Sequence, residues 1–277
     1  MSRIHDALKK AEIEQANYPV DRAQPHVVAA ASVEEVPPAI PAVTTMPSFS
    51  IPLTVEALQE RAAIHSWQPD ANRMLFFRQR ETAAVETFRT LRSRLYQIRE
   101  RSPIKKLLIA GSLGDEGTSF VAANLAQVMV QHQGQRALLI DGDLRQGKLH
   151  SQLGAPSSPG LTEYLSGQGE ELAIIQRGPM ENLFFVPSGK TVSNPLELIA
   201  NGRINVLLNR LESLFDWIIL DSSPAVAVSD AGQLAAYCDA VLLVVRSNAT
   251  PSDFALRARD EFSGKKIVGV VLNGAER

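Results

Sequence analysis

The chain has 277 residues, 45% of them hydrophobic, which is enough for one large α/β domain with an appended segment. Its formal net charge of -2 argues against a nucleic-acid-binding protein, because no excess of lysine and arginine is present to contact phosphates. A single cysteine, Cys238, excludes an internal disulfide and fits a reducing compartment such as the cytoplasm. No run approaches the roughly 18 apolar residues of a membrane span, so we expect any link to a membrane to run through a partner.

The first 80 residues differ in composition from the rest. Residues 1–15 predict a short amphipathic helix with Ile4, Leu8 and Ala11 on one face, which is either a frayed terminal helix or a docking peptide for a partner. Residues 16–80 are rich in proline and alanine, and proline at this density blocks helices and sheet ladders. We therefore expect a disordered, flexible linker with one local helix at 55–64.

The folded domain is predicted to span residues 81–277. A helix at 81–100 carries an apolar stripe, and short apolar runs then alternate with helical patterns. Most of these runs are continuous rather than alternating, as is typical of parallel strands buried on both faces. Strands separated by helices predict a doubly wound, mainly parallel α/β sheet flanked by helices. The expected strands are 106–112, 136–142, 182–186, 217–222, 240–246 and 266–273.

A glycine-rich turn joins the first of these strands to the next helix. It covers residues 111–119 and reads GSLGDEGTS. A strand, a glycine-rich turn and a helix together present backbone N–H groups and a helix N-terminus to phosphate. Gly114 and Gly117 would let a ligand approach the backbone closely. An ordinary βα turn that happens to contain glycine is the alternative.

Three carboxylates follow buried strands. Asp141 ends the apolar run ALLID, Asp143 follows two residues later, and Asp221 ends the strand WIILD. We expect them on the side where open α/β sheets bind ligands, at the carboxyl ends of the strands. Carboxylates there can hold Mg²⁺ or orient an attacking hydroxyl. Each one alone could instead be a turn or helix-cap aspartate, but all three together with a phosphate loop favour a nucleotide site.

The order of these blocks resembles the cytoplasmic domain of bacterial tyrosine kinases, which belong to the deviant Walker class of P-loop ATPases together with the ParA and MinD type. The resemblance covers residues 80–273 and includes LLIDGDLR, GLTEYLSG, NPLELI, WIILDSSP and VLLVVR. It implies binding of ATP and Mg²⁺ at the loop, through Gly114, Asp115, Glu116, Gly117, Thr118 and Ser119. It also implies a role in exopolysaccharide or capsule biosynthesis and export.

The resemblance assigns further roles by position. Ser119, Asp141 and Asp221 match residues at the metal, and Asp141, Asp143 and Asp221 match the catalytic acids. Asn273 matches an asparagine that recognises adenine in related ATPases, although a strand-terminal turn asparagine is equally consistent with the sequence. Glu86, Arg89 and Arg92 resemble a motif that assembles subunits into rings, and their spacing also fits a solvated face with intrahelical ion pairs.

The loop departs from the family at the position of its lysine. Where the family has Gly-Lys-Ser/Thr, this chain has Gly117-Thr118-Ser119, and a threonine carries no charge to neutralise a triphosphate. Asp115 adds a carboxylate where the family has a small residue. Lys190 or Lys148 could supply a replacement lysine from another loop or subunit.

Bacterial tyrosine kinases generally end in a tyrosine cluster, whereas the four residues GAER end this sequence, so we expect any acceptor tyrosine to lie elsewhere. Tyr96 and Tyr164 fall in predicted helices, where packing roles are expected. Tyr18 in the predicted linker is the candidate acceptor.

Three functions are therefore carried forward. The first is a tyrosine-kinase-like cytoplasmic regulator with weakened or lost ATP use. It would form a homo-oligomeric ring, bind no nucleic acid, and reach the inner membrane through a polysaccharide co-polymerase that regulates chain length. The second is an active protein-tyrosine kinase, for which the retained metal-side acids argue. The third is a ParA/MinD-like positioning ATPase, against which the kinase-like blocks at 86–92 and 194–199 argue.

Overall fold

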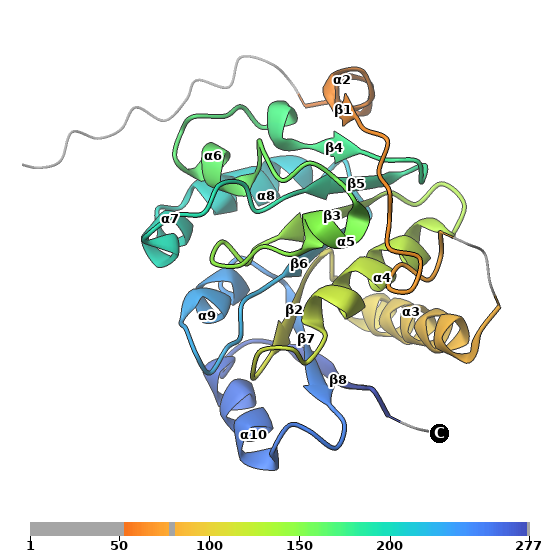
Figure 1. Cartoon of the computed structure of the whole chain (residues 1–277), viewed down its shortest axis with the longest axis vertical. Helices are drawn as coiled ribbons and strands as arrows, with labels where there is room; N and C mark the ends of the chain where they lie inside the picture. Colours follow the sequence, from red (N-terminus) through yellow and green to blue (C-terminus); the bar gives the residue numbers. More distant parts are fainter. Residues whose placement is uncertain (1–52, 78–80, 276–277) are drawn as a thin grey trace, which may run out of the picture. The chain divides into compact units, whose positions relative to one another are not determined.

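The computed structural model describes residues 53–77 and 81–275, which belong to one compact unit (Figure 1). The helix predicted at 1–15 and the linker from 16 to 52 lie outside the described residues. Within the described ranges, no helix has both the length and the apolar character needed to cross a bilayer.

A single sheet of eight strands runs through the described domain in the order β1-β4-β5-β3-β6-β2-β7-β8. All neighbours pair in parallel except β4 and β5, which are antiparallel. The prediction of a mainly parallel sheet is confirmed, and six of the strands match the expected ones. The other two, β1 and β4, have two residues each and carry no recognisable pattern. The strands are β1 (Ala63–Ile64), β2 (Lys106–Gly111), β3 (Ala137–Asp141), β4 (Gln176–Arg177), β5 (Leu183–Val186), β6 (Trp217–Asp221), β7 (Ala240–Arg246) and β8 (Ile267–Asn273).

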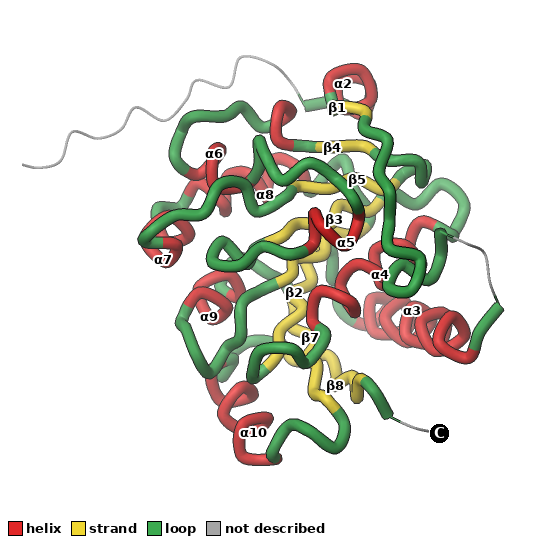
Figure 2. Tube along the Cα trace, in the orientation of Figure 1, coloured by secondary structure: helices red, strands yellow, loops and turns green. Residues whose placement is uncertain are grey.

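Helices cover both faces of the sheet (Figure 2). Alternate side chains of one strand enter different cores: Leu107 packs with α3, α4 and α5, whereas Leu108 packs with the helices of the opposite face. This explains the uninterrupted apolar runs, since both faces of the central strands are buried. The helices are α2 (Val55–Arg61), α3 (Ala83–Arg101), α4 (Thr118–Val130), α5 (Leu149–Leu153), α6 (Leu161–Leu165), the 3₁₀ turn η1 (Leu172–Ile174), α7 (Pro195–Ala200), α8 (Arg203–Leu211), α9 (Asp230–Ala235) and α10 (Ser252–Glu261).

Residues 53–77 differ from the flexible linker that we expected up to residue 80. Leu58 of α2 and Met74 are completely buried. Trp67 meets Phe185 edge to face, with ring centroids 6.0 Å apart, and packs so closely on Gly178 that no side chain fits there. The buried amide of Asn124 on α4 accepts a hydrogen bond from the Leu75 N–H group at 2.9 Å. The folded domain therefore includes this segment, which packs against the helix that follows the phosphate loop.

Replacing Thr54 with alanine tests whether this segment contributes to the stability of the domain. The Thr54 hydroxyl caps α2 by accepting from the Ala57 N–H group at 3.2 Å. Loss of such a cap costs about 1 kcal/mol, so we expect the urea midpoint of the whole domain to fall. Alanine at the exposed Thr191 is the matched control and leaves the midpoint unchanged. Equal midpoints for the two variants would mean that α2 unfolds independently of the domain.

Candidate nucleotide-binding site

The turn between β2 and α4 has the backbone form of an anion cradle. Gly117 precedes the first helical residue and adopts φ 91°, a left-handed conformation that suits glycine. Asp115 is also left-handed, with φ 61°, although it is not glycine. The first turn of α4 leaves N–H groups without intrahelical acceptors, and the helix dipole adds positive potential there. The predicted phosphate loop thus has the expected strand, turn and helix.

Glu116 braces this loop from inside the protein. Its side chain is 2% exposed, and it accepts hydrogen bonds from the Ser112 hydroxyl at 2.7 Å and the Leu113 N–H group at 2.9 Å. A third bond comes from the hydroxyl of Thr250, which follows β7. Because these bonds commit the carboxylate to the protein, only the backbone of Glu116 is left for the ligand role that the sequence predicted.

Asp141 and Asp221 lie side by side at the carboxyl ends of β3 and β6, where they are directly paired across the two strands. Both side chains are buried. Asp141 accepts from the Leu149 N–H group at 3.1 Å, and Asp221 accepts from the hydroxyl of Ser119 at the start of α4. The fold therefore brings three of the predicted site residues, Ser119, Asp141 and Asp221, into one place.

Burial perturbs both carboxyl groups. It raises the pKa of Asp221 to about 7, and the nearby charge of Asp143 adds to this increase. Burial and, after it, the charge of Asp221 raise the pKa of Asp141 well above its usual range. A buried carboxylate without a cation is costly, so this pair favours either a shared proton or a bound cation.

Asp143 has a different environment from this pair, although its N–H group donates to the Asp141 carboxylate at 3.3 Å. Its carboxylate accepts from the N–H groups of Arg145 at 3.1 Å and Gln146 at 3.2 Å, as a turn aspartate does. Arg145 in turn donates two hydrogen bonds, of 2.6 and 3.0 Å, to the buried Asp230. Asp143 therefore shapes the loop after β3 and contributes its charge to the site from the side.

The available oxygen ligands suit Mg²⁺, which keeps water and phosphate ligands, better than a metal ion whose ligands all come from the protein. In the part of the chain that the structure describes, no three His, Cys, Asp or Glu side chains converge as a metal site. One oxygen of Asp221, Oδ1, is buried and has no hydrogen-bond partner among the described residues. One or two carboxylates and a hydroxyl, completed by phosphate and water, are what Mg²⁺ usually accepts. Ser119 and Asp221 would hold it.

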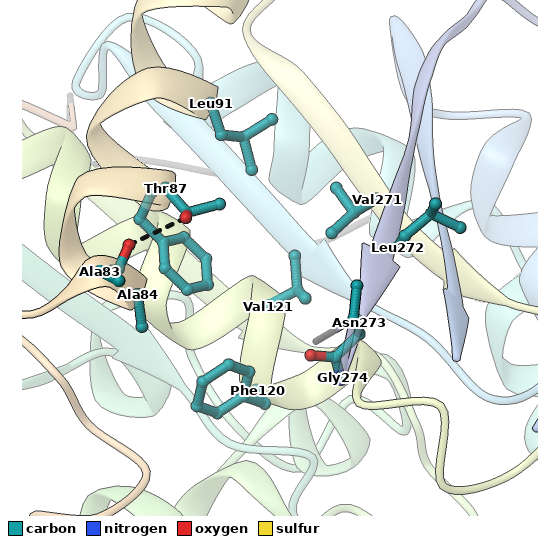
Figure 3. A pocket seen from close by; sticks show the side chains of 12 residues that line it. Ala83, Ala84, Thr87, Leu91, Phe120, Val121, Val271, Leu272, Asn273 and Gly274 are labelled. Atoms are coloured by element: carbon teal, nitrogen blue, oxygen red, sulfur yellow. Dashed lines mark hydrogen bonds between the residues drawn. The ribbon is translucent and has the colours of Figure 1, made fainter. Parts of the chain in front are cut away.

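Asn273 closes the loop on the side of β8. Its side-chain amide donates to the Glu116 carbonyl at 2.8 Å, and a Cβ atom on Gly117 would overlap that amide. Asn273 also lies at the edge of an apolar groove of about 370 Å³ (Figure 3). The groove lies between α3, α4 and the end of β8, and its lining includes Leu91, Phe120 and Gly274.

The three charged residues predicted to face a neighbouring subunit make contacts within this chain. Arg89 pairs with Glu81, at 2.6 Å, and with Glu86. Arg92 donates to the Val128 carbonyl of α4 at 2.9 Å and so fixes α3 against α4. The structure thus separates Arg92, which holds two helices together, from Glu86 and Arg89, which form an exposed cluster.

Comparison with known proteins places this chain in a family. The family model described as cellulose biosynthesis protein BcsQ matches residues 104–262, more than half of the chain. The chain belongs to this family. The curated proteins to which this BcsQ-family chain is similar include proteins named as tyrosine kinases. The tyrosine-protein kinase ptk of Acinetobacter johnsonii is 32% identical over 197 residues, which make up 70% of this chain and 27% of that protein.

Two further comparisons agree. A putative tyrosine-protein kinase in the cps region of Klebsiella pneumoniae is 34% identical over 193 residues, covering 69% of this chain and 27% of that protein. The kinase domain of the Escherichia coli tyrosine kinase ETK superposes with a TM-score of 0.66 at 27% identity, covering 81% of this chain and 97% of that one. The resemblance to bacterial tyrosine kinases is therefore confirmed, and this BcsQ-family chain spans about a quarter of the length of its curated relatives.

The sequence did not reveal every residue of the site. Ser112, Thr250 and Arg246 hold the loop, yet each is a common residue type in a segment without a distinctive motif. Only the pairing of β2 with β7 brings Arg246 and Thr250 next to the loop.

Proposed function

We propose that this chain is a nucleotide-binding domain of the bacterial tyrosine kinase type that acts in exopolysaccharide or capsule assembly and transfers phosphoryl groups much more slowly than its relatives. One observation carries the proposal. Thr118 is the first residue of α4, where the resemblance implies a lysine, while Asp221 is paired with Asp141 across two strands and accepts from the Ser119 hydroxyl. The residues that would hold Mg²⁺ are present, whereas the positively charged lysine of the loop is replaced by threonine.

Each part of the site has a role in this proposal. Backbone N–H groups of the loop and of the first turn of α4 bind the phosphates. Ser119 and Asp221 hold Mg²⁺, which neutralises phosphate charge when bound. Asp141 holds a proton or orients the attacking hydroxyl. The groove beside Asn273 is apolar and large enough for a nucleobase, so we assign it to adenine.

Two features support slow transfer. Thr118 supplies no charge, and Asp115 adds a carboxylate to the loop. The described tyrosines are also poor acceptors. Tyr164 is 2% exposed, and Tyr96 packs edge to face on Trp217 with its hydroxyl bonded to Gln135. Tyr237 is half-buried, and its hydroxyl accepts from the Gln233 amide at 3.1 Å and donates to the Ile199 carbonyl at 3.4 Å. Tyr18, the remaining candidate acceptor, lies outside the described residues.

The cellular role rests on the relatives, one of which is named for a cps region. The proposal includes a membrane polysaccharide co-polymerase as partner, a peripheral place at the inner membrane through that partner, and a ring of subunits. Ring assembly through α3 would use Glu86 and Arg89, because Arg92 already holds α4. Those two residues would exchange their present ion pairs for pairs with a neighbouring subunit.

Labelled ATP with Mg²⁺ tests the proposal on the full chain. We expect ADP and ATP to bind, and transfer of label to protein or water to be barely above that of the Asp141→Ala variant. Absence of nucleotide binding would contradict the proposed function. Rapid transfer to tyrosine that disappears in Asp141→Ala would establish the second candidate, an active kinase, which is favoured by the intact arrangement of Ser119, Asp141 and Asp221.

A further inference from the structure

Three side chains from the carboxyl ends of β7 and β8 hold the phosphate loop. The Arg246 guanidinium donates to the Asp115 carbonyl at 2.9 Å. The Thr250 hydroxyl donates to the Glu116 carboxylate, and the Asn273 amide donates to the Glu116 carbonyl at 2.8 Å. Consecutive residues of the loop are thus held by a segment more than a hundred residues away in the sequence.

Hydrogen bonds to Thr250 and Asn273 fix the backbone around Arg246. Its carbonyl accepts from the Thr250 N–H group at 3.0 Å, and its own N–H group donates to the Thr250 hydroxyl at 3.3 Å. The next residue, Ser247, donates from its N–H group to the Asn273 carbonyl at 2.8 Å. This hydrogen-bonded turn holds the guanidinium of Arg246 beside the loop.

The charge of Arg246 is not neutralised by a neighbouring acid. Among the described residues, no carboxylate oxygen lies within the 4.0 Å of an ion pair from its guanidinium. Arg145, which follows β3 near the acid pair, is instead paired with the buried Asp230. Arg246 is exposed, and its guanidinium carries a positive charge with several N–H donors.

We infer that Arg246 is the cation of this phosphate loop and takes over part of the electrostatic role of the lysine that is absent at Thr118. The inference rests on the proposed binding of nucleotide. A loop that contains Asp115 and Glu116, and whose Ser119 bonds to one of two adjacent buried acids, repels a polyphosphate. A fixed positive charge bonded to the backbone of the loop offsets that repulsion, while its hydrogen bond holds Asp115 in its left-handed conformation.

Calorimetric titration of the full chain with Mg²⁺-ADP tests this assignment in two backgrounds, wild type and Thr118→Lys. In each background Arg246 is changed to glutamine, which keeps a donor without the charge, and to lysine, which keeps the charge. We expect Arg246→Gln to weaken binding by about fivefold at low salt, as for a single partly exposed charge. Arg246→Lys should lose much less. The control is Arg259→Gln, an exposed arginine near the end of α10, which should leave affinity unchanged.

Salt separates a charge effect from a structural one. If Arg246 acts by its charge, the loss caused by Arg246→Gln shrinks at 0.5 M salt, where exposed charges are screened. A loss that is equal for glutamine and lysine, or that does not change with salt, would overturn the assignment, as would unchanged affinity in both backgrounds. If the wild type binds no ADP but Thr118→Lys does, the proposed function is contradicted. The Arg246 variants in the Thr118→Lys background then still test whether Arg246 contributes its charge to binding.

Discussion

Restoring a lysine at Thr118 is expected to raise phosphoryl transfer on the order of 10²–10³-fold, the size of effect seen when one pre-organised electrostatic contact is gained or lost. The side chain at position 118 already points over the loop. The methyl group of Thr118 lies 2.9 Å from where a Cβ atom on Gly111 would be, so the side chain lies over the beginning of the loop. A lysine there would extend along the cradle toward the phosphates. Labelled ATP with Mg²⁺, measured under single-turnover conditions, checks the rate.

The matched control separates charge from bulk. Thr118→Met adds a chain of similar reach without an ammonium group, and we expect it to leave transfer at the wild-type level. Nucleotide affinity should rise only for Thr118→Lys. Equal rates for the lysine and methionine variants would mean that the missing cation is not what limits the reaction, and that another feature such as Asp115 does.

Much of the fold follows from the sequence because each central strand must be buried on both faces. The apolar run 240–245 predicted β7, which spans Ala240–Arg246, because five successive buried residues are typical of a strand covered on both faces. In the segment 53–77 the predicted local helix is present as α2, whereas prolines such as Pro69 favoured a flexible linker where apolar residues in fact pack on the domain. Trp67 contacts Phe185, and Met74 contacts Gln127. Because these partners are far away in the sequence, the contacts leave no periodic pattern in the segment itself.

The candidate site also contains features that the sequence predicts and others that only the fold determines. Carboxylates at strand ends were predicted together because parallel strands end at one edge of the sheet, and Asp141 and Asp221 are indeed adjacent. The inward orientation of Glu116 was not predictable, because it depends on a hydrogen bond from Thr250, which lies in the connection after β7. Sequence spacing thus locates groups on neighbouring strand ends, while the direction of a loop side chain is set by partners that only the fold supplies.

The second large effect concerns stability rather than rate. Burial raises the pKa of Asp221 from 3.8 to about 7, so the folded protein binds more protons than the unfolded chain between these values. The contribution of Asp221 to the free energy of unfolding is therefore greatest below about pH 4. This contribution is lost as the pH rises through about 7. Since one pK unit corresponds to about 1.4 kcal/mol, the loss amounts to a few kcal/mol.

Asp221→Asn removes this loss, because asparagine keeps an oxygen for the Ser119 hydroxyl and offers an amide to the neighbouring Asp141. We expect the variant to exceed wild type in urea midpoint at pH 8 with chelator present, and the difference to close toward pH 4. Mg²⁺ should raise the midpoint of wild type only, since a bound cation replaces the proton. Asp260→Asn, an exposed control, should follow wild type at every pH. Parallel curves for Asp221→Asn and wild type would show that the buried pair does not strain the metal-free fold, and the retained acids would then no longer argue for a cation site.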